Sequence, residues 1–490
     1  MKQRKPVRLG ARRDHDRVVY PEVIFFLCDL VLKTRVNPNY PSPPTYFRVT
    51  TAILGGGLSG LTLARLLHER GDDVIVLEAE QNPGGLCRSI QVKGFTFDVG
   101  GSHIIFSRDA EVLAFMRRMI AGNEERNNRN TRIFYKNRYV KYPFENGLAD
   151  LPPDDRFFCI NEFVKAQIAF ETGSVPHPSN FREWIYFTFG KGIADCYMVP
   201  YNEKIWKYPT DRMSHHWVEG RVPRPPIEDV IKSAIGIPTE GYTHQSVFSY
   251  PAQGGIEALI HAIGAPVKGR IRTGFCVRSI KKSGNCFLIS DGTEIIEADR
   301  CICTLPVQHL IACLDNVPAT VQQACRALVY NSLVCVAVGI RGNVPDISWL
   351  YVPELSLGRT NRISFPSNYS SQTAPEGCSS VLAEITHQPG DEVSVMTDAE
   401  LSEHVTVMLE KMGLISRDSV IMTRIWRQPF AYVVYDLEYQ KNIDIIRNYC
   451  STVGIPLVGR FARFEYLNMD GCIRSAMDFV SMYPRTQGPS

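Results

Sequence analysis

Residues 51–60 read TAILGGGLSG, an apolar run that ends in Gly55, Gly57 and Gly60. The stretch LTLARLLHERG follows at 61–71 with the spacing of an amphipathic helix. In a strand–turn–helix unit with this pattern, the first glycine permits a tight turn, the second lets backbone approach a pyrophosphate, and the third lets helix pack on strand. The N–H groups that open the helix can then bind phosphate oxygens. The segment therefore predicts a dinucleotide site.

An acidic residue at the expected distance strengthens this prediction. A second apolar run, DDVIVLEAE at 72–80, carries Glu78 about twenty residues after the glycines, where the dinucleotide fingerprint places a ribose-binding acid. A carboxylate there accepts from ribose hydroxyls and disfavours a 2′-phosphate, so the adenosine half belongs to FAD or NAD rather than NADP. A glycine-rich turn that binds nothing is the alternative, and Glu78 argues against it.

A second glycine block favours the flavin. Gly84, Gly85 and Arg88 lie in NPGGLCRS, and Gly101 and His103 lie in FTFDVGGSHIIF at 95–106. These blocks resemble the second glycine pair and the flavin-facing loop of the glutathione-reductase-like flavoproteins, which include amine oxidases, protoporphyrinogen oxidases and UDP-galactopyranose mutases. The resemblance implies FAD as the cofactor.

The amino-acid composition limits which other classes of protein this chain can belong to. The 490 residues include 54 Lys and Arg against 51 Asp and Glu, a net charge of +3, which gives no global field for nucleic acid or acidic membrane. The 14 cysteines show no metal-ligand spacing, so we expect reduced thiols, no metal and a cytoplasmic protein. The apolar segment VIFFLCDLVL at 23–32 is too short to span a bilayer, and we expect no integral membrane segment. The oligomeric state stays open.

The patterns along the chain predict an α/β protein, a glutathione-reductase-like Rossmann FAD-binding fold with a helical insert and a mixed-sheet substrate domain. Helical spacing dominates 108–235, a strand–hairpin–strand pattern fills 271–305, and a strand, a turn and a helix are expected over 458–480. The expected domains are an N-terminal extension for which disorder is one interpretation (1–47), a first FAD-binding segment (48–107), a helical substrate domain (108–240), a second FAD-binding segment (241–305), a sheet-containing substrate domain (306–445), and a third FAD-binding segment with a C-terminal helix (446–490).

From about residue 50 to 483 the chain resembles UDP-galactopyranose mutases, the eukaryotic type most closely. The blocks that carry this are RYVKYPFENGLADLP at 138–152, SWLYVP at 348–353, NRISFPSNYS at 361–370, FAYVVYDLE at 430–438 and GRFARFEYLNMD at 459–470. The resemblance implies an isomerase in which reduced flavin N5 attacks the anomeric carbon of a nucleotide-linked sugar, UDP leaves, and the ring recloses in another size. NADH or NADPH is a candidate reductant.

The resemblance also implies which residues form the site. Arg362 matches the pyrophosphate-binding arginine and, with His103 beside the flavin, is our candidate for catalysis. The expected cofactor-binding residues are Gly55, Gly57, Gly60, Glu78, Gly84, Gly85, Arg88, Gly101, Val277, Arg460, Asn468, Met469 and Asp470. The expected substrate-binding residues are Tyr142, Trp184, Trp349, Tyr351, Arg362, Tyr432 and Tyr466. For the tryptophans and Tyr351, core packing is an equal alternative, and a backbone-satisfied histidine is the alternative for His103.

Two departures from the mutase pattern bear on function. Val199 stands where the mutases have a second phosphate-binding arginine, and Glu145 stands where they carry a glutamine for the uracil edge. The loss of one charge-assisted contact is worth about 1.5–3 kcal/mol. Val199 and the segment CTLPV at 303–307 favour a second hypothesis, an oxidoreductase of the amine oxidase or protoporphyrinogen oxidase type that transfers hydride from substrate to flavin. A non-enzymatic flavin-binding subunit is the third.

Overall fold

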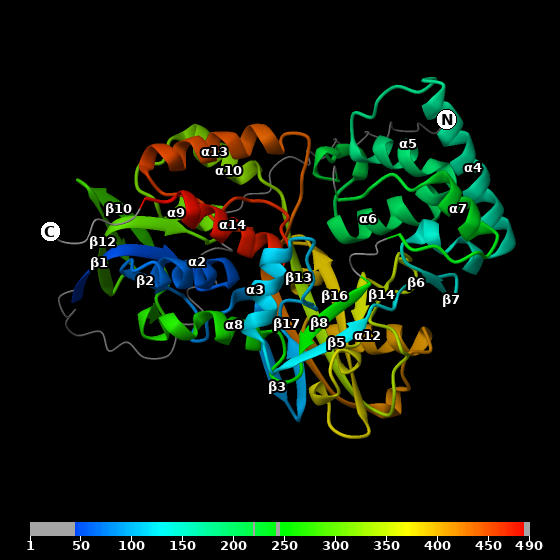
Figure 1. Ribbon diagram of the computed structural model, residues 1–490, viewed down its shortest axis with the longest axis horizontal. Coiled ribbons are helices and arrows are strands. Elements are labelled where there is room, and N and C mark those ends of the chain that lie inside the picture. Colours follow the sequence, from blue (N-terminus) through cyan, green and yellow to red (C-terminus); the bar gives the residue numbers. More distant parts are fainter. Residues whose placement is uncertain (1–44, 219–220, 242–245, 485–490) are drawn as a thin grey trace, which may run out of the picture. The chain divides into compact units, whose positions relative to one another are not determined.

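The computed structural model describes residues 45–218, 221–241 and 246–484. The expected N-terminal extension therefore lies almost wholly outside the described residues, and the first strand begins at Thr45. Figure 1 shows the described residues from the blue first strand to the red last helix. The strands are β1 Thr45–Leu54, β2 Val74–Leu77, β3 Ser89–Val92, β4 Phe95–Asp98, β5 Glu124–Asn128, β6 Thr131–Tyr135, β7 Arg138–Lys141, β8 Val247–Pro251, β9 Ile271–Arg272, β10 Ser279–Ser283, β11 Cys286–Ser290, β12 Glu294–Cys303, β13 Tyr330–Arg341, β14 Trp349–Tyr351, β15 Arg362–Ser364, β16 Cys378–His387 and β17 Val420–Val433.

Helices connect these strands and form a separate group in the middle of the chain. The α-helices are α2 Leu58–Glu69, α3 Ala110–Met119, α4 Pro153–Glu171, α5 Phe181–Ile193, α6 Val199–Trp206, α7 Ile227–Ala234, α8 Glu257–Gly264, α9 Val307–Cys313, α10 Ala319–Ala327, α11 Glu392–Val395, α12 Asp398–Lys411, α13 Tyr439–Val453 and α14 Met469–Met482. Short helical segments used below are η1 Gly85–Cys87, η2 Phe144–Asn146 and the π-helical turn η4 Ala194–Met198.

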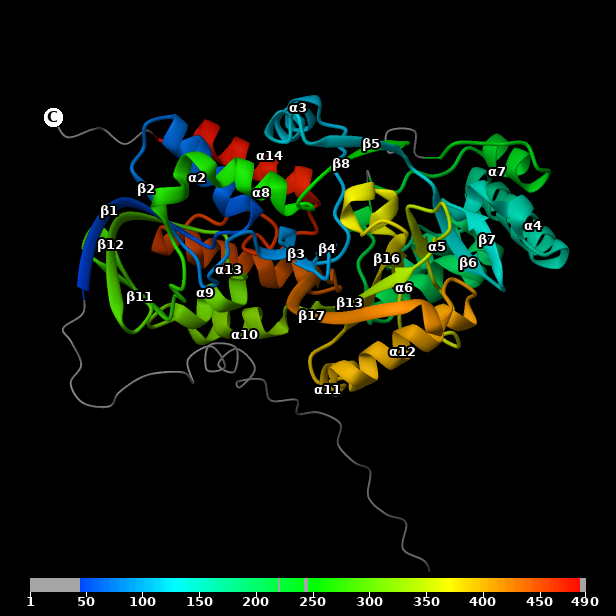
Figure 2. The same cartoon turned by 90° about the horizontal axis from the view of Figure 1, so that it is seen from below.

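The first sheet has six strands in the order β10-β11-β12-β1-β2-β9, with β12, β1, β2 and β9 parallel. Its central strand β1 is apolar on both faces. Ala52 and Leu54 pack with α9, α10 and α13, whereas Ile53 packs with α2 and α14. Figure 2 shows these two helical layers on opposite sides of the sheet. Burial on both faces explains why residues 52–54 are continuously apolar rather than alternating.

The second sheet has seven strands in the order β17-β13-β16-β15-β14-β6-β7. Along β13, Val334, Val336 and Val338 face α12, whose first turn is fixed by a capping box between Thr397 and Glu400. The alternate residues of β13 face the β3-β4 hairpin through Phe95 and Phe97. This second face, opposite α12, is the one that carries the candidate site.

The structure differs from the sequence prediction in three places. The stretch 124–141, expected within a helical domain, forms β5, β6 and β7, and β6 and β7 extend the seven-stranded sheet. The prediction of a strand at the beginning of 458–480 is wrong, because the chain there turns at Gly459 and Phe464 with positive φ angles of 82° and 53°. The expected boundary between 445 and 446 falls inside α13, whose Ile443, Ile446 and Cys450 pack in the core of the six-stranded sheet.

Candidate functional site

The predicted dinucleotide turn forms between β1 and α2. Gly55 has a φ of +97°, and a Cβ at Gly60 would lie 1.9 Å from the carbonyl oxygen of Gly55. A Cβ at Gly57 would lie 4.0 Å from the nearest protein atom, the Cα of Gly85. Gly60 is therefore required by the packing of the turn itself, whereas the space beside Gly57 is open to a ligand.

Glu78 follows β2 and closes the same turn. Its carboxylate accepts from the backbone N–H groups of Gly56 at 2.7 Å and Glu80 at 2.8 Å. Burial raises the pKa of Glu78 in spite of these bonds. The N–H of Phe275 donates to the carbonyl oxygen of Glu78 at 2.8 Å, which brings the segment with Val277 beside the acid. This bond ties the segment that contains Val277 to the end of β2.

The second glycine block is joined directly to the first. The N–H of Gly84 donates to the carbonyl oxygen of Gly56 at 2.8 Å, and Gly85 opens the short helix η1. Arg88 donates from Nε to the carbonyl oxygen of Gly85 at 3.2 Å, and its Nη1 lies 3.7 Å from Glu80. The two glycine blocks, predicted separately, form one continuous backbone surface.

Asp98 at the end of β4 holds the loop that follows, and it was not among the residues expected from the sequence. Its carboxylate accepts from the Ser89 hydroxyl at 2.7 Å, the Tyr250 hydroxyl at 3.0 Å and the Ile256 N–H at 3.1 Å. Burial raises the pKa of Asp98 to about 6. A buried acid in the otherwise uncharged run FTFDVGG is the signal that could have identified it.

The loop 101–103 contains the predicted histidine. The imidazole Nδ1 of His103 bonds the carbonyl oxygen of Gly101 at 2.7 Å, so Nδ1 carries the proton and Nε2 is left as the acceptor. Burial lowers the pKa of His103 to about 4, and the nearby Arg362 and Arg460 act in the same direction. The imidazole is therefore neutral near pH 7. The neighbouring Ser102 donates its N–H to Glu384 at 3.1 Å.

Arg362 lies in a row of residues that crosses the seven-stranded sheet. Tyr351 on β14 is directly opposite Arg362 on β15, and Arg362 is directly opposite Glu384 on β16. The neighbouring residues Leu350, Ile363, Ala383 and Ile385 face α12, so strand alternation places the row on the other face. Two residues predicted from separate motifs, Tyr351 and Arg362, are thereby brought together by strand pairing.

Glu384 is the second functional residue that was not expected from the sequence. Its side chain is fully buried, and it accepts from Arg362 Nε at 2.9 Å and Arg362 Nη2 at 2.7 Å. Burial acts to lower the pKa of Arg362, but the Glu384 carboxylate raises it well above its usual range. Glu384 is the one acid in the strand SSVLAEITH, and an acid in such a buried strand indicates a paired charge.

Two of the predicted tyrosines meet beside Arg460. The rings of Tyr432 and Tyr466 lie 5.9 Å apart, and the Arg460 guanidinium lies 5.4 Å and 4.8 Å from them. Arg460 also donates to the carbonyl oxygens of Leu467 and Ala431, while its buried Nε has no protein partner among the described residues. Three further residues that the sequence did not reveal contact Tyr466: Trp206, Trp217 and Arg221.

A second aromatic group surrounds Tyr351. Its ring lies 5.1 Å from that of Tyr142 and 5.2 Å from that of Tyr201, a residue of α6 that the sequence did not reveal. The buried Tyr201 hydroxyl has no partner in the described residues, and its electrostatic neighbours include Arg362 and Tyr432. Trp349 joins the group through Arg129, whose guanidinium lies between Trp349 and Tyr142 at 5.0 Å and 4.8 Å.

Trp184 is the predicted substrate-binding residue that the structure leaves apart from this group. It stacks on Phe181 at 5.9 Å, and Phe181 in turn contacts Trp217 at 5.2 Å. Trp206 and Trp217, rather than Trp184, are the helical-region tryptophans in contact with Tyr466. The packing interpretation of Trp184 accounts for these contacts.

The two departures from the mutase pattern lie on different elements, α6 and η2. Val199 begins α6 and is partly buried among apolar side chains of the helical region. Glu145 lies in η2, and burial raises its pKa to about 7. Its carboxyl can therefore be neutral under ordinary conditions and serve as both donor and acceptor.

The predicted C-terminal cofactor residues begin the last helix. Asn468 precedes α14, Met469 is its first residue, and Asp470 accepts from the Ser107 hydroxyl at 2.7 Å. In the same segment, a Cβ at Gly459 would lie 2.2 Å from the Ser59 hydroxyl oxygen in the first turn of α2. This contact brings the segment to the dinucleotide turn.

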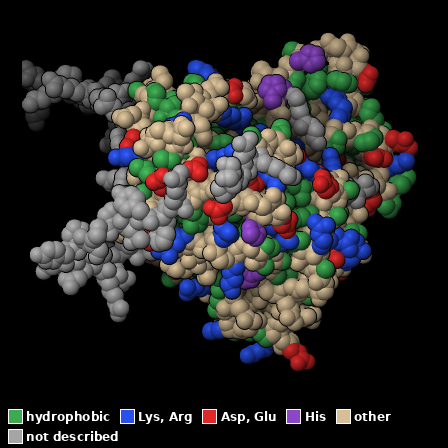
Figure 3. Space-filling model, turned by 60° about the vertical axis from the view of Figure 1, so that its left-hand side comes forward, with side chains coloured by type: hydrophobic (Ala, Val, Ile, Leu, Met, Phe, Trp, Pro, Cys, Tyr) green, Lys and Arg blue, Asp and Glu red, His purple; other side chains and the backbone are tan. Residues whose placement is uncertain are grey.

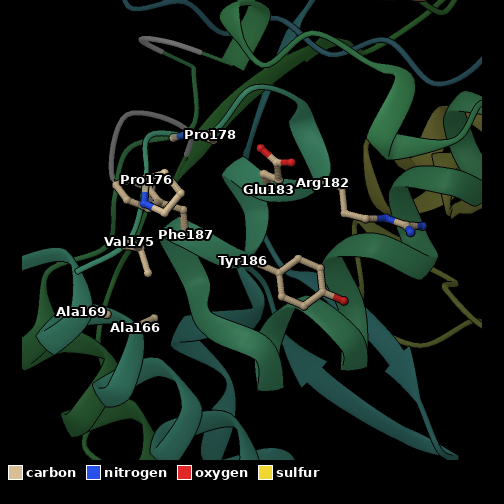
Figure 4. Close-up of a pocket in the computed structure, with 9 residues that line it drawn as sticks. All are labelled: Ala166, Ala169, Val175, Pro176, Pro178, Arg182, Glu183, Tyr186 and Phe187. Carbon is tan, nitrogen blue, oxygen red and sulfur yellow. The ribbon is translucent and has the colours of Figure 1, made fainter. Parts of the chain in front are cut away.

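Another recess lies in the helical region. A mainly apolar recess of about 360 Å³ lies between α4 and α5, lined by residues such as Val175, Pro176, Tyr186 and Phe187 (Figure 4). Its charged residues are already paired, Arg182 with Glu203 and Glu183 with Ser179. On the face drawn in Figure 3, basic and acidic side chains are interspersed. Among the described residues, no helix is long and apolar enough to cross a membrane, and no three candidate ligands converge as a metal site.

The six-stranded sheet with helices on both faces and a glycine turn at β1-α2 defines a Rossmann-like dinucleotide-binding protein. Residues 53–119 match the model of the NAD(P)-binding Rossmann-like domain, and residues 213–478, more than half of the chain, match the model of flavin containing amine oxidoreductase. The chain belongs to the flavin-containing amine oxidoreductase family, and this membership implies FAD. The predicted fold class is confirmed.

Solved structures give the same fold over most of the chain. The crystal structure of reduced UDP-galactopyranose mutase is 26% identical with a TM-score of 0.79, covering 88% of this chain and 95% of that one. A putative protoporphyrinogen oxidase from Exiguobacterium sp. 255-15 is 16% identical with a TM-score of 0.68, covering 89% of this chain and 98% of that one, and shows the fold alone.

One curated relative aligns with a short segment of the chain. The inactive all-trans-retinol 13,14-reductase of Danio rerio is 46% identical over 65 residues, which is 13% of this chain and 11% of that protein. The match thus spans about a tenth of that relative.

Proposed function

We propose that this chain is an FAD-dependent isomerase of the UDP-sugar mutase type that acts on a nucleotide-linked sugar. The observation that carries the proposal is the group of phenols around Arg362, from Tyr351, Tyr201 and Tyr432 on three different elements. A guanidinium among several hydroxyls suits a diphosphate, because it offers charge and directed donors together. The 26% identity to reduced UDP-galactopyranose mutase over most of both chains supports the same conclusion.

The residues of the first sheet fit FAD. The open space beside Gly57 and the N-terminus of α2 suit a pyrophosphate, and Glu78 keeps lone pairs that can accept from ribose hydroxyls. The C-terminal residues Asn468 to Asp470 would complete the pocket. When bound and reduced, FAD supplies an electron-rich nitrogen nucleophile.

The side chains around Arg362 would bind and orient the substrate. The Arg362 nitrogens Nε and Nη2 donate to Glu384, so the edge formed by Nη1 and Nη2 can donate to a phosphate oxygen. The Tyr201 hydroxyl can donate a further bond. The aromatic walls formed by Tyr142, Tyr351 and Tyr466 would exclude water, and the His103 Nε2, unprotonated near pH 7, can accept a proton.

An oxidoreductase is the second candidate. The family model is that of amine oxidoreductases, and Val199 leaves the pocket with one arginine fewer than the mutase pattern. Such an enzyme would take hydride from an amine or a porphyrinogen and would then need reoxidation. The two candidates differ in the redox state that is active.

Anaerobic turnover distinguishes them. We expect dithionite-reduced protein, or protein reduced by NADH or NADPH, to convert a UDP-hexose into an isomer of identical mass and altered ring size. Oxidised protein should not do so. Oxygen uptake on adding an amine or a porphyrinogen, with no isomer formed from any UDP-hexose, would overturn the proposal in favour of the oxidoreductase.

A further inference from the structure

Two cysteines outside the candidate site lie together in the helical region. Cys159 is on α4, with no exposed surface, and Cys196 is on the π-helical turn η4, partly exposed. The Cys159 and Cys196 thiols lie within hydrogen-bonding reach of each other, and the Tyr135 hydroxyl, which donates to Asp155, lies beside Cys196. A buried thiol and an accessible thiol are thus in direct contact.

The helix crossing explains why the two cysteines meet. A Cβ at Gly192 would lie 2.5 Å from the Cα of Cys159, and a Cβ at Gly190 would lie 2.4 Å from the carbonyl oxygen of Glu162. The two glycines let α5 approach α4 at backbone distance. The chain then continues from this crossing directly into η4, which keeps Cys196 beside Cys159.

The surroundings favour the thiolate form of Cys196. The Cys159 thiol and then the Tyr135 hydroxyl lower the pKa of Cys196, Lys136 acts in the same direction, and burial and Asp155 oppose them. Lys136 and Tyr135 are held in place by Asp155, at 2.7 Å and 3.2 Å from its Oδ2. For Cys159, the bond it donates to Cys196 and its burial raise the pKa. One thiol is therefore the better nucleophile, and the other is poised to react with its oxidation product.

We propose that Cys159 and Cys196 form a reversible dithiol/disulfide pair that responds to a hydroperoxide. The Cys196 thiolate would attack one peroxide oxygen, giving a sulfenic acid and releasing hydroxide, which takes up a proton. The Cys159 sulfur would then displace water from the sulfenic acid and form the disulfide. For hydrogen peroxide the balance is two thiols and one peroxide to one disulfide and two waters, and an external dithiol reverses it.

The pair is connected to the candidate site through the residue that follows Cys196. The Tyr197 ring stacks on Phe144 at 5.0 Å and on Tyr201 at 5.3 Å, both at 12° from parallel. A disulfide would hold η4 against α4 and so fix this stack. An effect on nucleotide binding would rest on the proposed function, whereas disulfide formation does not, so the two are measured separately.

The first experiment needs no variant. The full chain is treated with hydrogen peroxide, its remaining thiols are blocked, and it is digested with trypsin without reductant. Cleavage after Arg156, Lys165, Lys191 and Lys204 puts each cysteine in its own peptide, residues 157–165 and 192–204. We expect these two peptides as one linked species that dithiothreitol separates. The proposal would be overturned if the two peptides were recovered unlinked, with their thiols blocked, at peroxide concentrations that oxidise other cysteines of the chain.

Variants test the order of events. Cys159→Ala should leave a sulfenic acid on Cys196 that dimedone traps, and Cys196→Ser should leave Cys159 unmodified. Tyr135→Phe should slow alkylation of Cys196 several-fold near neutral pH and move its half-maximal rate to higher pH. Cys286→Ser, which removes a partly exposed thiol on the β10-β11 hairpin, is the matched control and should leave the linked species unchanged. Dimedone on Cys159 instead of Cys196 would contradict the assignment of the nucleophile.

Discussion

Arg362 and Glu384 form a bidentate ion pair at 2.9 Å and 2.7 Å, and the Glu384 side chain has no exposed surface. The same carboxylate accepts the N–H of Ser102, and a Cβ at Gly101 would lie 3.0 Å from it. One buried acid thus joins the predicted phosphate-binding arginine to the loop predicted to face the flavin. Arg362 has a structural role as well as a proposed binding role, and the two can be separated.

Removing Arg362 alone should destabilise the protein. Arg362→Ala leaves a buried carboxylate unpaired, which costs about 3–5 kcal/mol. The double variant Arg362→Ala/Glu384→Ala removes both charges, so we expect it to recover much of that stability. Urea unfolding of the two variants beside the wild type measures the difference.

The same pair of variants tests binding. Both should bind UDP at least tenfold more weakly than the wild type, because both lack the guanidinium. A tenfold loss corresponds to about 1.4 kcal/mol of binding free energy. Calorimetry with UDP gives the affinities. Wild-type affinity in the stable double variant would show that Arg362 does not contact the nucleotide.

Substitutions of the two glycines in the dinucleotide turn should have different effects, one on flavin binding and the other on stability. Gly57→Asp places its side chain in space where the nearest protein atom lies 4.0 Å from the Cβ, so we expect a folded protein that purifies without flavin. Gly60→Val forces the turn apart, because its Cβ would lie 1.9 Å from the Gly55 oxygen, and should unfold at lower temperature. Flavin absorbance and circular dichroism separate the two effects. Gly269→Ala is the control, because a Cβ at this position would have no atom within 4 Å. Stoichiometric flavin in purified Gly57→Asp would contradict the assigned site.

The sequence predicted those regions of the site that depend on local chain geometry. Gly55, Gly60 and Glu78 lie within one consecutive strand–helix–strand unit, β1-α2-β2, so their spacing alone brings them together. Glu384 and Tyr201 could not be found in this way, because strand pairing and the packing of α6 bring them to Arg362 from distant regions of the chain. The same reason explains β6 and β7, since β6 pairs with the distant strand β14 and β7 pairs with β6.

His103 should make the protein less stable in mild acid. Its pKa is lowered to about 4 by burial, against about 6.5 when unfolded, so between these values the unfolded chain binds a proton that the folded chain does not. Its contribution to the free energy of unfolding therefore falls by up to about 2 kcal/mol from pH 7 to pH 5. Asp98, with its raised pKa, acts in the opposite sense, so the wild type and His103→Gln are compared at both pH values. If the free energy of unfolding changed equally in both proteins between pH 7 and pH 5, His103 would not be a buried neutral imidazole.

The Tyr201 hydroxyl should contribute to binding and not to folding. It is buried without a partner in the described residues, so Tyr201→Phe should leave the unfolding temperature unchanged or raise it. If the hydroxyl donates to a phosphate, UDP affinity should fall about tenfold or more. Tyr197→Phe, in the same aromatic stack, is the matched control. Lower stability with unchanged affinity would assign Tyr201 to packing instead.

Val199 offers a gain-of-function test of the proposed chemistry. It begins α6, the helix that carries Tyr201, and is partly buried among apolar side chains, at the position where the mutase pattern has a second phosphate-binding arginine. Val199→Arg would restore a charge-assisted contact worth about 1.5–3 kcal/mol, so we expect UDP to bind roughly ten- to a hundredfold more tightly. Isomerisation of a UDP-hexose by reduced protein should accelerate if this contact limits the rate. Val199→Met, which adds volume without charge, controls for packing. Tighter binding in both variants, or in neither, would contradict an electrostatic origin.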